Sequence, residues 1–347
     1  MKKSTLISII SVVAGLVLIA IGFGMVRGDY MKLNGKSTQG NWVNETYECT
    51  SNIDHIDIDE RSETTKVVTG NVDKPVISYW HYEKDEDIVE ITEKSGTLHF
   101  VRKERKVFSF GPIVSFNVQD TSTLVTLPRD YKGKIEVSAS SGSVFAEGIS
   151  NEDDVKLEAS SGSVHATSLN CKDVELKATS GSIKAEDIVS EGEAKLSNTS
   201  GSISVKKLTV KDDFSAKNSS GSIKLEDLTC KDLEAENTSG GVRLDQVTAK
   251  EASIKSSSGS VKLDDVSADK VDAKSTSGSI SLKDLTSPEI VMKANSGGIH
   301  GNIKGNEKDY SIISSTGSGS CNLKDSREGS KSLDVSTTSG SIRITFD

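Results

Sequence analysis

The stretch EASSGSVHA at residues 158–166 recurs along most of this chain, and it decides the fold. Its Ser-Gly-Ser centre returns every 19 or 20 residues, followed by two looser copies at Gly319 and Gly340. A fixed period of about 20 residues predicts a solenoid, in which a short unit buries its apolar face by stacking on copies of itself. The glycines of the regular copies are Gly142, Gly162, Gly181, Gly201, Gly221, Gly240, Gly259, Gly278 and Gly297.

Apolar residues alternate with polar ones on both sides of each glycine. Seven residues before it stand Ile135, Val155, Val174, Ala194, Phe214, Leu233, Ala252, Val271 and Ile290, and two residues after it stand Val144, Val164, Ile183, Ile203, Ile223, Val242, Val261, Ile280 and Ile299. A period of two indicates strands. We therefore expect two short strands per repeat, joined by a corner where glycine permits a positive φ or a tight turn. The predicted fold is all-β: a parallel β-helix, or β-solenoid, whose coils stack at about 4.8 Å.

The N-terminal run from Thr5 to Val26 has no charged side chain and follows Lys2 and Lys3. At about 1.5 Å per residue, a helix of this length crosses the ~30 Å hydrocarbon core of a bilayer. A cleavable signal peptide has a shorter apolar region. We predict a retained signal anchor with a cytoplasmic N-terminus, which places the rest of the chain outside the cytoplasm.

These patterns predict the organisation of the whole chain. The segments are a cytoplasmic stub at 1–4, a transmembrane helix at 5–26, a linker at 27–40, a strand-rich cap with irregular coils at 41–130, and regular repeats at 131–347. In the cap, Gly96 resembles a degenerate corner. The final strand, from Ser341 to Phe346, has no following coil in the sequence and predicts an uncovered edge for self-association.

Composition narrows the classes of partner. The chain has 347 residues, a formal net charge of −9 and only 5% aromatic residues. Phosphate binding needs clustered Lys and Arg, so this balance argues against nucleic acid and against anionic lipid surfaces. No cysteine or histidine spacing predicts a metal or redox cofactor.

Three asparagines share one position, three residues before the corner glycine, in consecutive repeats. They are Asn198, Asn218 and Asn237. Stacked identical amides can hydrogen-bond from coil to coil and satisfy one another in a core. We predict a structural asparagine ladder here, without a ligand role.

Acidic residues form two further columns, which raise the alternative of bound calcium. One column holds Asp187, Asp227, Asp265 and Asp284, and its neighbour holds Glu186, Glu226, Asp245 and Asp264. Stacked carboxylates repel one another unless they are paired or metal-bound. Lysines such as Lys206 and Lys207 interrupt both columns, which favours ion pairs between coils.

The anchor, the strand-rich lead-in, the motif of Leu127, Pro128 and Tyr131, and the Ser-Gly-Ser repeats together resemble the bacterial "putative adhesin" family of unknown function. That family includes LiaG-like membrane proteins of envelope-stress operons and is related to the head-GIN adhesin-like domains. The resemblance covers residues 50 to 347. It implies a β-helix and brings no catalytic residues.

Two classes of function follow. The first is a non-enzymatic, adhesin-like surface scaffold that contacts a cell-envelope component or a membrane protein, with a role in envelope stress; a calcium-stabilised wall-binding module is a variant of it. The second is a polysaccharide-active enzyme, since β-helices host such chemistry. The regular repeats carry few aromatic residues that could form a sugar platform, which favours the scaffold.

Overall fold

The computed structural model describes residues 42–83, 85, 88–103 and 120–347, so the predicted membrane anchor lies outside the described residues. Among the residues described, no helix has the length and hydrophobicity needed to cross a bilayer. The chain divides into a small unit, Met1–Val43 with Tyr82–Lys84, and a large unit, Asn44–His81 with Asp85–Asp347. In the small unit the rings of Trp42 and Tyr82 lie 4.0 Å apart. The large unit contains the repeats.

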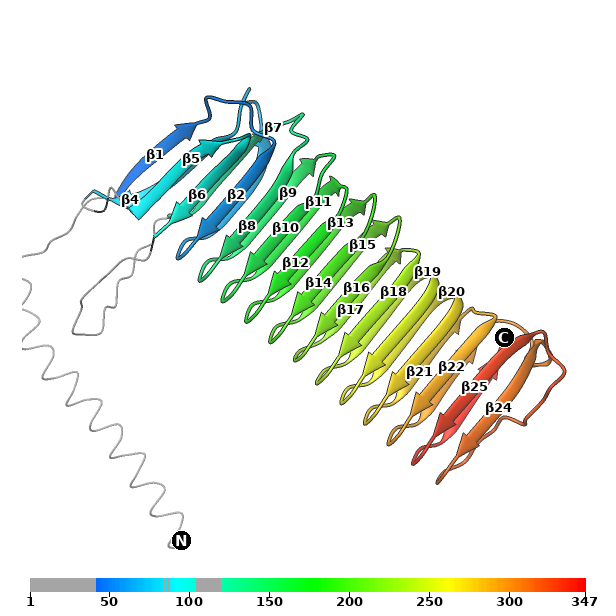
Figure 1. Cartoon of the computed structure of the whole chain (residues 1–347). Coiled ribbons are helices and arrows are strands. Elements are labelled where there is room, and N and C mark those ends of the chain that lie inside the picture. Colours follow the sequence, from blue (N-terminus) through cyan, green and yellow to red (C-terminus); the bar gives the residue numbers. More distant parts are fainter. Residues whose placement is uncertain (1–41, 84, 86–87, 104–119) are drawn as a thin grey trace, which may run out of the picture. The chain divides into compact units, whose positions relative to one another are not determined.

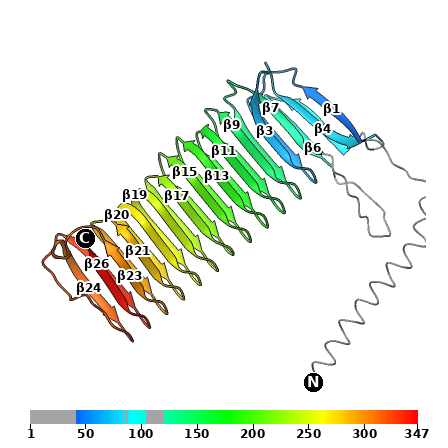
Figure 2. The same ribbon diagram turned by 180° about the vertical axis from the view of Figure 1, so that it is seen from behind.

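Two ladders of parallel strands form the solenoid, and they face the viewer in turn in Figures 1 and 2. The first ladder precedes the Ser-Gly-Ser corners and contains β2 (His55–Glu60), β6 (Thr97–Arg102), β8 (Lys134–Ala139), β10 (Val155–Ala159), β12 (Val174–Ala178), β14 (Ala194–Asn198), β16 (Phe214–Asn218), β18 (Asp232–Asn237), β22 (Glu289–Ala294), β24 (Tyr310–Thr316) and β25 (Lys331–Thr337). The second ladder follows the corners and contains β3 (Thr65–Gly70), β7 (Thr123–Pro128), β9 (Val144–Ser150), β11 (Val164–Cys171), β13 (Ile183–Ser190), β15 (Ile203–Val210), β17 (Ile223–Thr229), β21 (Ile280–Leu285), β23 (Ile299–Ile303) and β26 (Ile342–Phe346).

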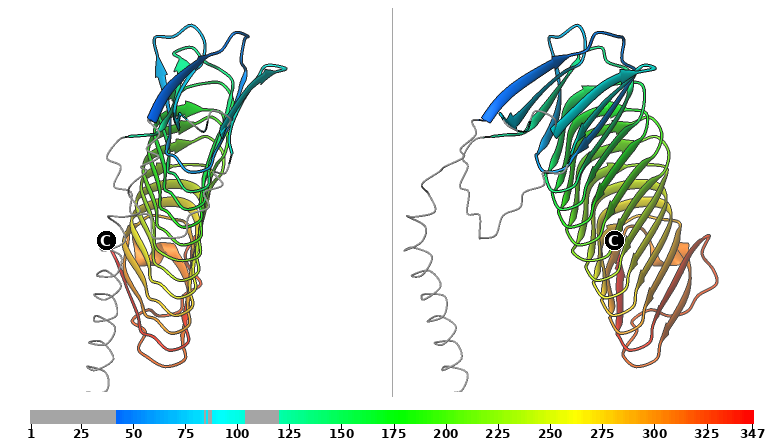
Figure 3. Two further views of the ribbon diagram at one scale, coloured as in Figure 1. Left: turned by 90° about the vertical axis from the view of Figure 1, so that its left-hand side faces the viewer. Right: turned by 60° about the vertical axis from the view of Figure 1, so that its left-hand side comes forward.

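Two long strands and three antiparallel or peripheral ones complete the fold. β19 (Val242–Ser256) and β20 (Val261–Ser275) run through the second corner and belong to both ladders. β5 (Val89–Lys94) pairs antiparallel with β6, β4 (Val76–Tyr82) pairs antiparallel with β7, and β1 (Trp42–Glu48) pairs with β4. A short 3-10 helix, η3 (Glu307–Asp309), precedes β24. Figure 3 shows the coils of the large unit stacked along one axis.

The predicted β-solenoid is confirmed, down to the inward columns. The position seven before the glycine pairs from coil to coil as expected and is buried throughout, as is the position two after it. Where the large Phe214 enters the core, the inward residue two positions further along its strand is Ala216. Packing at the density of a crystal explains this exchange, since a second large side chain would leave no room.

The corner glycines are required mainly because the coils approach closely there. A Cβ on Gly162 would lie 2.0 Å from the carbonyl oxygen of Gly142, and one on Gly181 would lie 2.0 Å from that of Gly162. The same contact recurs from corner to corner, whereas φ is positive only at Gly221 and Gly319 among the corner glycines. Close stacking of backbone on backbone therefore explains why a glycine recurs at each corner with a nearly constant period.

A left-handed residue bends the strands of the second ladder from β9 to β21, six residues after the corner glycine. In eight coils this residue has a φ between 51° and 66°: Gly148, Ser168, Asp187, Lys207, Asp227, Gln246, Asp265 and Asp284. The ladder skips it, so Thr167 pairs with Glu186 and Leu169 pairs with Ile188. Two neighbouring side chains thus point outward at the bend, and the next buried residue comes three positions after the previous one.

The coils at the N-terminal end do not follow chain order. β2 lies between β6 and β8, and β3 lies between β7 and β9, so β6 and β7 stack outside the earlier strands β2 and β3. The segment Leu127–Tyr131 makes the return: the Tyr131 amide donates to the Pro128 carbonyl at 3.1 Å, and the Tyr131 hydroxyl donates to the Lys134 carbonyl at 3.2 Å. Gly96 is not a corner, since with Ser95 it turns the antiparallel hairpin of β5 and β6.

The C-terminal end is exchanged in the same way, as Figure 1 shows with β25 between β22 and β24. The expectation of an uncovered final strand is wrong. The Ile342 amide donates to the Ser320 carbonyl at 2.8 Å, and the Asn322 side chain bonds both backbone groups of Ile344. The edge of β24 is covered in part by residues 325–326, because the Ile312 amide donates to Ser326. Covered edges oppose pairing with another chain.

The corner contact predicts a sharp penalty for a single methyl group. We expect Gly181→Ala to lower the free energy of unfolding by about 2–4 kcal/mol, because backbone must move to admit the Cβ. Gly192→Ala is the control: the atom nearest to its new Cβ belongs to the Asp173 side chain, which can rotate away at the cost of its hydrogen bond from the Glu193 amide, and we expect a loss of about 1 kcal/mol. Chemical denaturation followed by circular dichroism measures both. Equal losses would contradict the stacking argument.

The bend predicts a stabilising substitution. Gln246 holds a left-handed conformation that costs an ordinary residue roughly 1–2 kcal/mol, so Gln246→Gly should raise the free energy of unfolding by about 0.5–1 kcal/mol after glycine's own entropy loss. Thr248→Gly, two residues further along the same exposed edge, should lower it by about 1 kcal/mol. The same denaturation experiment distinguishes them, and a loss in both variants would refute the assignment of strain.

Candidate functional site

An open groove runs along the first ladder beside the Ser-Gly-Ser corners. It has a volume of about 450 Å³ and crosses five coils, from β12 through β14, β16 and β18 to the second half of β19. These strands lie side by side in Figure 1. Its direction therefore follows the solenoid axis, across the strands.

The predicted asparagine column forms the floor of the groove. Asn198, Asn218 and Asn237 stack in register after Ala178 and are buried. The amides do not bond to one another as expected. Each Nδ2 instead donates to the corner glycine carbonyl of the preceding coil, with distances of 2.8 Å for Asn198 to Gly181, 2.9 Å for Asn218 to Gly201 and 2.8 Å for Asn237 to Gly221.

This column clamps the corners in the middle of the solenoid and near its C-terminal end, whereas Ala139, Ala159, Ala178 and Ala294 occupy it elsewhere. Ser256 and Ser275 donate to Gly240 and Gly259, each at 3.0 Å, and Thr337 donates to Gly297 at 2.8 Å. In the N-terminal coils the equivalent position holds Glu60, paired through Arg102 with the outermost coil. Each of these side chains donates to the carbonyl of a corner glycine, and the lack of a Cβ on the glycine of the next coil lets the two corners come this close.

One wall of the groove carries charged side chains that are already paired. Lys217 lies 2.8 Å from Glu234, Lys255 lies 2.8 Å from Glu236, and Lys177 lies 3.7 Å from Glu158. The Lys255 ammonium holds the pKa of the Glu236 carboxyl below its usual value, although partial burial opposes the shift. The Lys255–Glu236 pair is therefore stabilised in its ionised form, and each lysine of this wall has a carboxylate beside it.

The opposite wall consists of hydroxyl groups. It is formed by the exposed residues two positions before each corner glycine: Thr199, Ser219, Thr238 and Ser257. The serine after the glycine is engaged within the corner, since the Ser182 amide donates to the Ser163 hydroxyl at 3.1 Å. The groove thus offers hydroxyl, amide, ammonium and carboxylate groups, a mixed set of hydrogen-bond donors and acceptors.

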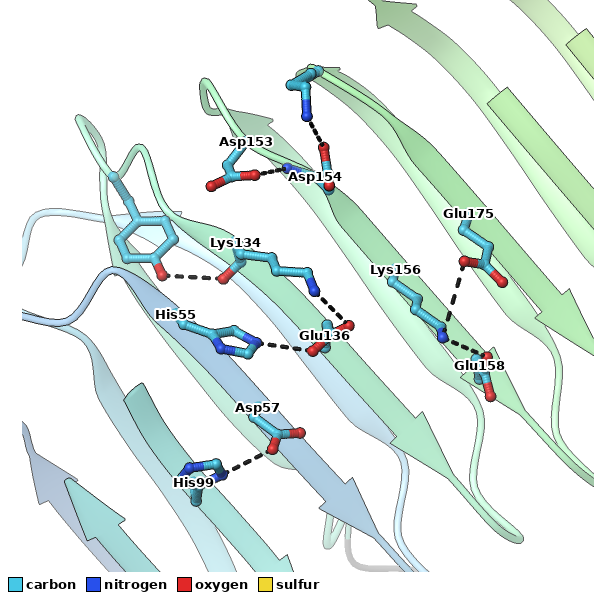
Figure 4. A network of polar contacts seen from close by, with 12 residues as sticks. His55, Asp57, His99, Lys134, Glu136, Asp153, Asp154, Lys156, Glu158 and Glu175 are labelled. Carbon is cyan, nitrogen blue, oxygen red and sulfur yellow. Dashed lines mark hydrogen bonds and ion pairs between the residues drawn. The ribbon is translucent and has the colours of Figure 1, made fainter. Parts of the chain in front are cut away.

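A second polar surface lies on the outer face of the first ladder near the N-terminal end, where Figure 4 shows its side chains on neighbouring strands. His55 lies 2.9 Å and Lys134 lies 2.8 Å from the Glu136 carboxylate, while His99 lies 2.8 Å from Asp57. The Lys134 ammonium, with His55, keeps the pKa of Glu136 below its usual value against the effect of burial. These contacts tie successive strands together across the face.

The acidic columns are engaged in ion pairs and hydrogen bonds. Glu186 lies 2.9 Å from Lys184, and Arg243 lies 2.7 Å from Asp245 and 3.4 Å from Asp264. Across the described ranges, no group of three or more His, Cys, Asp or Glu side chains is placed to hold a metal ion. Lysine or arginine side chains therefore lie beside six of the eight carboxylates that had raised the calcium alternative, and Asp284 instead accepts from the Asn302 side chain.

The inward columns of the repeat contain the floor of this groove but not its walls. The walls come from the columns four and two residues before the glycine, which point outward and so carry no information about the core. Aligning Lys177, Ser197, Lys217, Glu236 and Lys255 by the same offset would have shown one wall. The signal was thus present in the repeat.

Removing one clamp tests the role of the floor. Asn237→Ala leaves the Gly221 carbonyl and the Gly240 amide without their partner, so we expect a loss of about 1–3 kcal/mol in the free energy of unfolding. Asn237→Ser should lose less, because Ser256 makes both equivalent bonds in the next coil. Denaturation curves of the two variants decide this, and identical curves would argue against the clamp.

Comparison with known proteins gives a family and no function. No curated protein matches the chain. Two solved structures show a distant likeness. One is a "putative adhesin" from Bacteroides fragilis, with 12% identity, coverage of 88% of this chain and 97% of that chain, and a TM-score of 0.29. The other is a "putative lipid binding protein" from Parabacteroides distasonis, with 19% identity, coverage of 73% of this chain and 95% of that chain, and a TM-score of 0.38. Identities and TM-scores this low support no argument about function. The model of the Toastrack DUF4097 family matches residues 53–212 and 209–347, so the chain belongs to that family.

Proposed function

We propose that this chain is a non-enzymatic surface interaction protein, held at the cell membrane by an N-terminal anchor at residues 5–26 and displaying its solenoid outside the cytoplasm. Its partner is a component of the cell envelope. A role in envelope stress belongs to the same proposal, through the resemblance to LiaG-like proteins.

The observation that carries the proposal is the groove along the corners. Each coil presents polar side chains at the same offsets, and the hydroxyl wall repeats at about 4.8 Å intervals along one axis. A regular, extended surface suits contact with an extended partner better than enclosure of a small substrate, for which sites are usually concave and mostly apolar.

The fold also supports a scaffold role. The faces of the solenoid are laced with ion pairs between coils, and the ends of both ladders that the structure describes near the C-terminus are covered by the chain's own segments. Such a body holds its surface rigid while remaining protected from edge pairing. The apolar run at 5–26 would keep it near the membrane.

Cosedimentation tests the proposal. The full chain, in a mild non-glycosidic detergent, is centrifuged with purified cell-wall sacculi and, separately, with membrane vesicles from the same cells, each with and without a chelator. Vesicles of pure lipid serve as the control for the anchor alone. We expect more protein with the sacculi, or with the cell membranes, than with pure lipid, irrespective of chelation. No excess over the lipid control would overturn the proposed function, and an excess that a chelator abolishes would replace it with a calcium-dependent wall-binding module.

A further inference from the structure

We propose that β5 is a self-association edge, to which a second copy of this chain adds its own β5 in antiparallel orientation about a twofold axis at Thr92. The two copies then meet at their N-terminal ends, and their first ladders join into one sheet. This inference goes beyond the proposed function and does not rest on it.

The outer side of β5 is a free strand edge. β5 lies outside β6 at the N-terminal end of the first ladder (Figure 1). Backbone groups of an antiparallel strand point alternately toward the partner strand and away from it. The Lys103 amide donates to the Ile88 carbonyl at 2.7 Å, in continuation of the pairing between β5 and β6. Val89, Ile91 and Glu93 therefore direct their backbone groups away from β6, to a side on which the structure describes no paired strand.

This edge lacks the protection found near the C-terminus. There, residues 320–322 bond to β26 and residues 325–326 bond to β24. The outward side chains of β5 are exposed, and the inward Val89 and Ile91 are only half-buried. β5 contains no proline and keeps an unbroken register with β6, so two common devices that blunt an edge strand are missing.

A twofold axis at Thr92 gives the edge a self-consistent register. Ile91 then stands opposite Glu93 of the second copy, and both residues have backbone groups free to exchange hydrogen bonds. The Glu93 carboxylate is already engaged by the same chain, since the Thr50 and Ser51 amides each donate to it at 2.8 Å. Thr92 faces its own copy in a pair without backbone hydrogen bonds, where the side chains lie closer together.

The charges of β5 match those of a second β5. The same axis sets Glu90 opposite Lys94 of the second copy, and this pair occurs twice across the contact. Opposite charges in facing positions stabilise a sheet, whereas like charges destabilise it. Lys94 is exposed and makes no ion pair among the residues that the structure describes. Glu90 lies 3.1 Å from Lys103, but both side chains are more than half exposed, so the carboxylate can receive a second cation.

Disulfide cross-linking at the twofold axis tests the inference. Two facing residues without backbone hydrogen bonds have Cα atoms about 4.5 Å apart, which a disulfide can span. The full chain carrying Thr92→Cys is oxidised in detergent at several protein concentrations, and the dimer is measured on non-reducing gels. We expect far more dimer than with the wild-type chain, whose four cysteines are buried or half-buried, or with Thr209→Cys, an exposed position in the middle of the solenoid.

Charge variants of the Thr92→Cys chain test the choice of partner. Lys94→Glu sets like charges opposite each other at two places, so we expect about fivefold less cross-linked dimer. Adding Glu90→Lys exchanges the two charges and should restore the dimer. Cross-linking of Thr92→Cys no greater than that of Thr209→Cys, or an exchange that restores nothing, would overturn the inference. The proposed function would stand in either case, because pelleting with sacculi or membranes measures it separately.

Discussion

The close approach of one corner to the next governs this molecule. In most corners, a Cβ added to the glycine would lie about 2 Å from a carbonyl oxygen of the preceding coil, which is too close for any side chain. Glycine is therefore needed once per coil, and its recurrence sets the period of every other column. The asparagine, serine and threonine clamps act at the same contact, because in their coils the approaching carbonyl finds a donor in the column beneath the corner.

The same constraint places the candidate groove. Clamping side chains must lie beneath the corner and point inward, so the residues on either side of them in the strand point outward and form two walls. The position of the groove therefore follows from corner stacking, and its polar character follows from the side chains at the outward positions. Its central coil, with Gly221 in a left-handed conformation, is the place where the repeat and the requirements of corner satisfaction diverge.

Sequence alone predicts the β-solenoid and its inward columns because alternation and period are local properties. It does not predict which coil neighbours which at the ends: residues 56–58 and 98–101 both read as strands, and their alternation is compatible with either stacking order. The asparagine ladder was misjudged in its bonding because an amide has an equally good partner in the backbone. The bend at residues such as Gln246 was encoded in the three-residue step from Leu244 to Val247, which strict alternation overlooks.

Because the order of the end coils is exchanged, adding or removing a coil has different consequences at the ends of the solenoid and in its middle. At each end, an outer coil covers its inner neighbour, and removing either would expose the edge of a ladder. A coil added after Phe346 could not pair with β26, because residues 320–322 already bond to that strand. Whole coils inserted or deleted between Gly142 and Gly297 would leave both closures as they are. The number of coils between Gly142 and Gly297 can therefore change, while the stacking order of the coils at the two ends of the solenoid cannot.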